Sequence, residues 1–298
     1  MMIKSLYDLG FVTSRFKIYL NLPYQLQRKI KASFSRDLFT KISALCKPKN
    51  IGDLTTEELS HVDNLKELGW SKLGQVLSFN EVDELKLKLV NVPLEDRFRP
   101  ELGQFTYENI PKVSHVASYV IDDWNQFPEI IELANSKSLL KIAGDYLGCM
   151  PTISNLQLWW SLPGHSVAEQ AENFHRDVDD WKFIKLFIYL TDVNEDSGPH
   201  VYVQKSCKKN RDLPIKRYTD REIEGLFGAE NIIQMLAKRG EGILEDTFGF
   251  HKGQLAEKNS RLLLQVQYSI NPIAINKYVP KPSNLEFDIY TNRLYLKK

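Results

Sequence analysis

The chain has 298 residues, of which 43% are hydrophobic and 11% aromatic, and these proportions are sufficient for a sizeable buried core. Its apolar runs stay below the roughly 18 residues of a membrane-spanning helix. Its three cysteines are widely spaced without a CxxC pair, which argues against a disulfide framework or a thiolate zinc site. Residues 1–50 contain ten Lys or Arg but only two acidic residues. We therefore expect a cytoplasmic protein in which a basic helical extension (1–50) precedes one globular domain (51–298).

A basic amphipathic helix is predicted between residues 23 and 46. Apolar residues recur there every three or four positions and form one stripe, while basic residues occupy much of the remaining surface. The stripe consists of Leu26, Ile30, Phe34, Leu38, Ile42 and Leu45. Such a helix packs its stripe on its own domain, or it contacts an anionic membrane surface or an acidic partner.

Capping signals predict further helices in the first half of the chain. Thr55 with Glu58, and Ser78 with Glu81, match the capping box ahead of apolar periodic runs. Gly148 is placed to end another helix. The first half is therefore predicted to be mostly helical.

After residue 151 the pattern changes to short β-branched or aromatic segments separated by turn residues. These segments cover residues 156–160, 182–190, 201–203, 242–246 and 261–268. Many short strands indicate a sandwich or barrel. Between them, Thr219 with Glu222 opens a segment that is predicted to stay helical as far as Ala237. We expect this connection, residues 212–239, to form a helical lid over the open end.

Two His-x-Asp triplets are candidate metal ligands. A ferrous centre that binds a chelating co-substrate and dioxygen leaves three positions for protein, which two imidazoles and one carboxylate fill. This composition yields about one such triplet by chance. His61 and Asp63 lie in a predicted helix, where residues two apart point to different faces. His175 and Asp177 are expected in an extended segment, where such residues share a face.

A downstream histidine and arginine complete the predicted site. His251 follows the second triplet, and Arg261 lies ten residues further along. 2-Oxoglutarate needs a cation for its distal carboxylate while its keto acid end chelates iron. Arg261 also opens an alternating strand in which Leu263, Gln265 and Gln267 share its face. The alternative is a surface arginine on an edge strand.

Several motifs resemble the phytanoyl-CoA dioxygenase family. They are the triplet 175–177, the turn 197–199, the block 245–253 and the pair 260–261, within a resemblance that covers about residues 65–270. The resemblance implies a mostly β fold with helical additions, namely a double-stranded β-helix (jelly roll, cupin-like) with its core at about 150–270 and flanking helices from the N-terminal half. It also implies Fe(II) held by His175, Asp177 and His251, and 2-oxoglutarate held by Arg261.

The implied reaction is an Fe(II)- and 2-oxoglutarate-dependent dioxygenation. It would hydroxylate an unactivated carbon of a small-molecule or carrier-linked substrate with O2 and release succinate and CO2. Asp177 is retained, whereas related halogenases replace this carboxylate, so hydroxylation or another oxidative outcome is favoured. The family commonly has a Pro-Gly-Ser-His turn where this chain has residues 204–207, Gln-Lys-Ser-Cys, which removes the basis for expecting an acyl-CoA substrate. The alternatives are a non-catalytic binding protein and a cupin-like metal protein that does not use 2-oxoglutarate. No nucleic-acid partner is expected.

Four further residues are candidate cavity contacts. Gln157 and Trp159 alternate on a predicted strand and are candidates to line the cavity, Gln157 beside 2-oxoglutarate and Trp159 beside substrate, although the tryptophan is equally typical of a core. His165 and His200 are candidate substrate contacts. A histidine that begins a strand, as His200 does, is more often a partly exposed residue. Cys207 is predicted to be an inert thiol.

Overall fold

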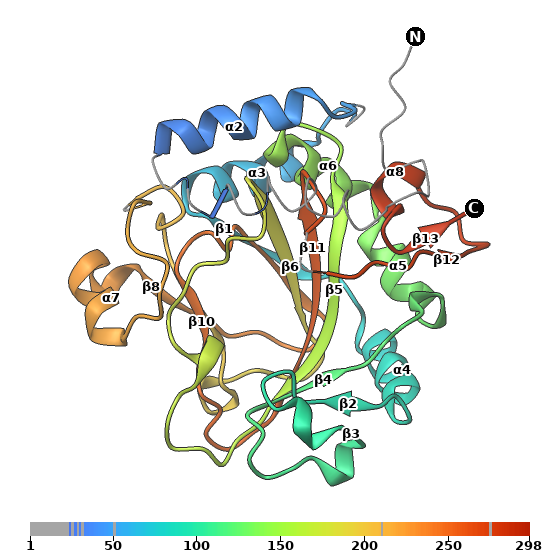
Figure 1. The fold of residues 1–298 in the computed structure, drawn as a ribbon, viewed down its shortest axis with the longest axis vertical. Coiled ribbons are helices and arrows are strands. Elements are labelled where there is room, and N and C mark those ends of the chain that lie inside the picture. Colours follow the sequence, from blue (N-terminus) through green and yellow to red (C-terminus); the bar gives the residue numbers. More distant parts are fainter. Residues whose placement is uncertain are drawn as a thin grey trace.

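Two antiparallel sheets form the centre of the molecule (Figure 1). The computed structural model describes residues 24, 27, 28, 30, 33–49, 52–209, 211–273 and 276–298. The larger sheet has eight strands in the order β1-β9-β6-β11-β5-β4-β2-β3, and the smaller has three in the order β10-β7-β8. A cavity between the two sheets is lined by residues from both.

The strands of the larger sheet are β1 (Trp70–Gln75), β2 (Leu94–Glu95), β3 (Gln104–Phe105), β4 (Val116–Tyr119), β5 (Thr152–Ser161), β6 (Phe183–Tyr189), β9 (Glu241–Glu245) and β11 (Arg261–Ser269). The smaller sheet contains β7 (His200–Val203), β8 (Ile232–Met235) and β10 (His251–Gly253), and a parallel pair joins β12 (Lys281–Pro282) to β13 (Leu296–Lys297). All five strands predicted after residue 151 are confirmed, as β5, β6, β7, β9 and β11. The prediction of a mostly helical first half is only partly right, because β1 to β4 also lie there.

The α-helices are α2 (Ser33–Leu45), α3 (Thr56–Glu67), α4 (Phe79–Leu89), α5 (Pro128–Ala134), α6 (Lys137–Leu147), α7 (Asp220–Phe227) and α8 (Ile289–Asn292). Short 3-10 helices cover Pro100–Leu102, Tyr107–Asn109, Trp124–Gln126, Gln170–Glu172, Glu195–Ser197 and Ala229–Asn231. The capping boxes predicted at Thr55, Ser78 and Thr219 are all present, and each satisfies backbone N–H groups that the helix itself leaves unpaired. Gly148 ends α6 in the left-handed conformation that glycine adopts without strain.

Alternation along β6 and β11 separates a core face from a cavity face. Ile184, Leu186, Leu262 and Leu264 are fully buried in the main hydrophobic cluster, together with apolar side chains of α3, α4 and α6. The alternate residues of the two strands face the cavity, which Lys185 on β6 and Arg261 on β11 line. Burial of the apolar face stabilises the fold, and the opposite face can therefore carry the polar side chains that line the cavity. Figure 1 shows α2, α3 and α6 together at one end of the sheets.

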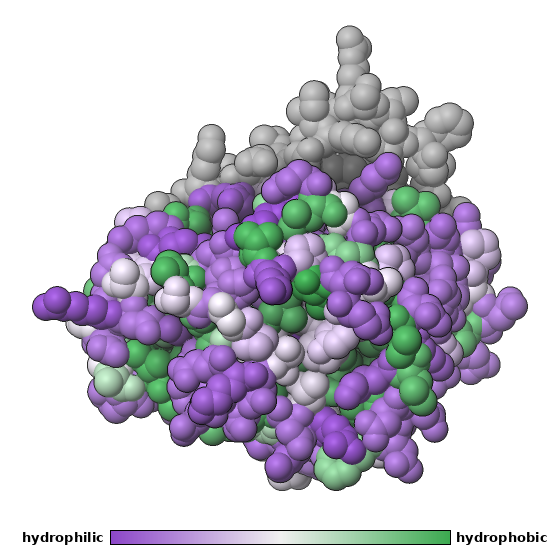
Figure 2. All heavy atoms as spheres, turned by 90° about the horizontal axis from the view of Figure 1, so that it is seen from below, coloured by the Kyte–Doolittle hydropathy of each residue, from purple (hydrophilic) through white to green (hydrophobic). Residues whose placement is uncertain are grey.

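The surface at one end of the molecule is mainly polar (Figure 2). Figure 2, seen from the end where β2 and β3 lie, shows hydrophilic side chains over most of that face, with apolar ones interspersed. Among the helices in the described part of the chain, none is both long and apolar enough to cross a membrane.

Helix α2 turns a different face inward than the apolar stripe predicts. Leu38, Ile42 and Leu45 are 46%, 48% and 66% exposed, whereas Arg36 is only 2% exposed. The Arg36 guanidinium donates to the Asp180 carbonyl oxygen at 2.6 Å, which compensates for its burial. The interpretation that the stripe packs on the domain is therefore wrong for these three residues. The part of the stripe at Leu26 lies outside the described residues, as does the side chain of Phe34, and contact with a membrane or partner stays a prediction.

The predicted helix at 219–237 is too long. It begins at the predicted cap but ends at Phe227, and Ile232–Met235 pair with β7 as a strand. Gly225 and Gly228 weaken the helix, while the β-branched pair that starts β8 favours a strand. Ile223 packs α7 into a small cluster with residues of β7. Within 212–239, which is fully described, no residue lines the cavity between the sheets, so the lid stays a prediction without a contact to support it.

Candidate metal centre

Three predicted ligands converge at one point of the cavity. One ligand atom from each of His175, Asp177 and His251 lies within 4.8 Å of the others. The Nε2 atoms of His175 and His251 lie 3.8 and 3.4 Å from oxygens of Asp177. Two imidazole nitrogens and one carboxylate on one side of an ion fit a divalent transition metal and leave positions open opposite them.

Backbone pairing brings the distant segments together. The His175 and His251 backbones exchange two hydrogen bonds, at 2.9 and 3.0 Å, and the Asp177 N–H donates to the Thr247 carbonyl at 2.9 Å. Arg176 points the other way, where it donates to the Ser206 carbonyl at 2.7 Å. The extended geometry expected from the triplet is therefore present. His61, by contrast, lies on α3 and hydrogen-bonds Ser71.

The imidazoles are oriented for ligation by Nε2. Nδ1 of His175 lies 3.0 Å from the Asn173 carbonyl oxygen, and Nδ1 of His251 lies 3.0 Å from that of Gly249. A carbonyl oxygen only accepts, so each Nδ1 carries the proton and each Nε2 presents its lone pair to the Asp177 side. Burial lowers the pKa of His175 well below its usual value, which keeps this imidazole neutral.

Lys185 is a neighbour of the ligands that sequence reasoning missed. Its Nζ lies 2.6 Å from Asp177 Oδ2 and 3.3 Å from Asp179 Oδ2. Burial by itself would raise the pKa of Asp177, but Lys185 and the histidines lower it well below its usual value. The sequence could have indicated this contact, because Lys185 is the single lysine within the apolar run of β6. A charged side chain in such a strand has to face a partner or a cavity.

The cavity beside the metal site has a volume of about 220 Å³ and extends to Arg261. Arg261 is 2% exposed and donates to the Gly198 carbonyl and, at 2.9 Å, to Ser161 Oγ. Its Nε has no hydrogen-bond partner, and it forms no ion pair with any carboxylate of the described chain. Burial without an anion lowers the pKa of this guanidinium. The edge-strand alternative is wrong, because Arg261 is enclosed.

Glycines allow the backbone to approach Arg261. Gly198 has a φ of 60°, and a Cβ there would meet the Gln254 carbonyl oxygen at 2.5 Å. A Cβ on Gly253 would lie 3.1 Å from the Arg261 guanidinium. The turn 197–199 singled out in the sequence therefore supplies a hydrogen-bond acceptor for the arginine and admits no larger residue at its centre.

Three of the four further candidates line the cavity, namely Gln157, Trp159 and His200. His165 is not among the lining residues, and it stacks on His115 with ring centroids 3.6 Å apart. Gln265 also lines the cavity, and its amide nitrogen has no partner in the described structure. The alternation of β11 already placed Gln265 on the face of Arg261.

His200 is 5% exposed, so the expectation of a partly exposed histidine is wrong. Its Nε2 lies 2.8 Å from Glu245 Oε2. Burial raises the pKa of Glu245 to about 8 and lowers that of His200. This pair is therefore a neutral hydrogen-bonded unit near neutral pH, placed beside His251 at a ring-centroid distance of 5.5 Å.

Cys207 is buried and lies outside this cavity. Burial raises the pKa of its thiol to about 12, so it carries almost no thiolate at neutral pH. The structure agrees with the prediction of an inert thiol.

Comparison with known proteins finds similar folds among solved structures. The sequence matches no family model and no curated protein. The crystal structure of HygX from Streptomyces hygroscopicus, with nickel and 2-oxoglutarate bound, aligns with a TM-score of 0.51 at 17% identity, over 82% of this chain and 96% of HygX. EvdO2 from Micromonospora carbonacea var. aurantiaca aligns with a TM-score of 0.50 at 13% identity, over 73% of this chain and 91% of EvdO2. The chain therefore shares the fold of HygX and EvdO2.

Proposed function

We propose that the protein is an Fe(II)- and 2-oxoglutarate-dependent oxygenase. One observation carries the proposal: a single cavity is lined both by a His-Asp-His ligand set and by a buried arginine that has no carboxylate partner within the described chain. A dicarboxylate with a keto group next to one carboxylate matches both features. The fold shared with HygX, whose crystal structure holds nickel and 2-oxoglutarate, supports the same assignment.

His175, Asp177 and His251 would hold the metal, and Arg261 would pair with the distal carboxylate of 2-oxoglutarate. A divalent ion adds two positive charges to the cavity and 2-oxoglutarate adds two negative ones. Binding of both therefore leaves the net charge of the buried site unchanged, which favours their joint binding. Gln265, with its unpaired amide N–H group, lies on the same strand and is placed to donate to the co-substrate.

Fe(II), when bound with 2-oxoglutarate and O2, supplies an oxidant through conversion of 2-oxoglutarate to succinate and CO2. The protein's own residues would position a carbon of the substrate and exclude water. Trp159, Phe187 and His200, which is hydrogen-bonded to Glu245, form the wall next to the ligands. We infer hydroxylation as the outcome, because Asp177 occupies the third ligand position.

The size of the cavity limits the part of the substrate that reaches the metal. A volume of about 220 Å³ is below the roughly 300–1,000 Å³ that is typical of sites for drug-sized ligands. The reacting group would therefore be small, either a small molecule or the end of a carrier-linked chain. Membership of the phytanoyl-CoA dioxygenase family stays a prediction.

The test is succinate release by the full chain with Fe(II), 2-oxoglutarate and O2 across a library of small molecules. A substrate should raise succinate formation above the uncoupled background in the wild-type protein and not in the Asp177→Ala variant. An Arg239→Met variant, changed at a surface ion pair with Asp83, is the control and should behave as wild type. If the wild type forms no succinate above the Asp177→Ala variant, with or without any compound, the oxygenase proposal is wrong.

A further inference from the structure

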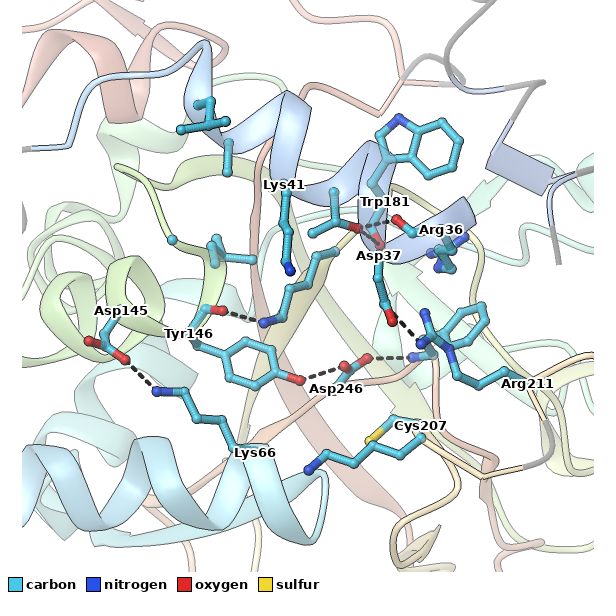
Figure 3. A pocket seen from close by; sticks show the side chains of 18 of the residues that line it. Arg36, Asp37, Lys41, Lys66, Asp145, Tyr146, Trp181, Cys207, Arg211 and Asp246 are labelled. Carbon is cyan, nitrogen blue, oxygen red and sulfur yellow. Dashed lines mark hydrogen bonds and ion pairs between the residues drawn. The ribbon is translucent and has the colours of Figure 1, made fainter. Parts of the chain in front are cut away.

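A second and larger cavity lies apart from the metal site, with a volume of about 820 Å³. It is bounded by α2, α3, α6, the two residues just before β6 and the loops that follow β7 and β9. It shares no lining residue with the cavity at the metal centre. Figure 3 shows side chains from these segments around one space, with Lys41 extending from α2 toward Tyr146 on the opposite wall. We name it the basic cavity, for the cations that line it.

The walls of the basic cavity carry an excess of positive charge. Seven cations and three carboxylates line it. The cations are Arg36, Lys41, Lys49, Lys66, Lys182, Lys208 and Arg211. Lys66 pairs with Asp145 and Arg211 with Asp37, both at 2.9 Å. The third carboxylate, Asp246, accepts from Tyr146 Oη at 2.6 Å. The other five cations form no ion pair with a carboxylate of the described chain.

Two of these five cations are desolvated by the fold. Burial lowers the pKa of Arg36 to about 10 and also lowers that of Lys182. The Lys182 ammonium donates to the Tyr146 carbonyl and lies 3.8 Å from the centre of the Tyr146 ring, contacts that leave further N–H donors available. Desolvated cations in a concave site attract anions more strongly than exposed ones, because water screens them less.

We propose that the basic cavity binds a ligand through a phosphate group. Phosphate brings two negative charges and several acceptor oxygens, which suits clustered lysines and arginines better than a single carboxylate does. The volume exceeds that needed for one phosphate, and the walls include Trp181, Leu147 and Ala44. The phosphate would therefore belong to a larger molecule. This site is additional to the proposed oxygenase function and does not depend on it.

Two sources of the phosphate group are distinguishable. One is a soluble phosphorylated metabolite, and the other is the headgroup of an anionic lipid. Leu45 lines the basic cavity, and Leu38 and Ile42 on the same helix are exposed, so an apolar edge lies next to the cations. A soluble ligand requires only the cavity, whereas a lipid would use this edge as well.

The test measures pyrophosphate binding by calorimetry and flotation with phosphatidylcholine vesicles that do or do not contain phosphatidic acid. Ionic strength is matched with sodium chloride. The key variant is Lys41→Ser/Lys208→Ser, because both lysines are exposed and their loss should leave the fold intact. The control is Lys238→Ser/Lys258→Ser, which removes the same charge from side chains that are 70% exposed elsewhere.

We expect the key variant to bind about tenfold or more weakly than wild type, since hydrogen bonds between charged groups are lost, while the control binds as wild type does. Pyrophosphate binding would support a soluble ligand, and flotation only with phosphatidic acid would support a lipid headgroup. Absence of both, or binding that is equal in the key variant and the control, would overturn the proposal. Metal binding at His175 and His251 is measured in parallel, and its loss bears on the oxygenase proposal alone.

Discussion

Replacing Arg261 by methionine tests the part of the site that we propose holds 2-oxoglutarate. The change keeps a long side chain but removes the Arg261 guanidinium, whose Nε has no partner within the described protein, and it leaves the other cavity cations, Arg97 and Lys185, in place. A buried carboxylate that loses its cation costs about 3–5 kcal/mol. At about 1.4 kcal/mol per tenfold, the dissociation constant of 2-oxoglutarate should rise by about 100- to 4,000-fold.

The assay is calorimetric titration of 2-oxoglutarate into the protein loaded with Co(II). Co(II) replaces Fe(II) because the Co(II)-loaded protein should not turn over 2-oxoglutarate in air. Affinity for Co(II) itself should stay within about threefold of wild type, because Arg261 is not a ligand. The Arg239→Met variant serves again as the matched control. The reasoning is refuted if Arg261→Met binds 2-oxoglutarate within threefold of wild type while it still binds Co(II).

Three further predictions concern the ligand set and the thiols. Asp177→Ala should abolish the rise in melting temperature that Co(II) gives the wild type, and an equal rise in both would exclude Asp177 as a ligand. Lys185→Met leaves Asp177 without its partner at 2.6 Å, so the metal-free protein should have a lower melting temperature, and Co(II) should raise that temperature by more than in wild type. Scanning calorimetry measures both, and an unchanged melting temperature of the metal-free protein would contradict this. At pH 8, iodoacetamide should label exposed Cys46 but not Cys149 or Cys207, whose pKa values burial raises to about 11 and 12; rapid labelling of either, detected by mass spectrometry, would contradict their burial.

Local patterns in the sequence were sufficient to predict many of the helices and strands. A capping box depends on two residues three apart, and strand alternation depends on the nearest neighbours, so the helix starts and the strands after residue 151 were predictable. The same reasoning separated His175 from His61, because only an extended segment places residues two apart on one face. Arg261 was predicted from its position ten residues after His251 and from the polar face of its strand, and its role for 2-oxoglutarate was implied by the family resemblance.

Features that depend on distant partners were not predictable. Lys185 contacts Asp177 only because the fold brings β6 next to the segment 175–177. Arg36 is buried because a carbonyl oxygen and an aromatic ring on other segments contact its guanidinium. These contacts turn the face of α2 that carries Arg36 inward, in place of the face that the apolar stripe predicts. The strand β8 forms where the sequence continued a helical pattern, since β7 offers it a hydrogen-bonding edge.

The most direct test of the central claim is anaerobic addition of Fe(II) and then 2-oxoglutarate to the wild-type protein, followed by visible absorption. Chelation of iron by the keto acid next to His175, Asp177 and His251 should give a weak charge-transfer band. The band should be absent in Asp177→Ala and should need far more 2-oxoglutarate in Arg261→Met. A wild-type protein that binds Fe(II) but shows no band at saturating 2-oxoglutarate would contradict the account and favour a metal site that does not use this co-substrate.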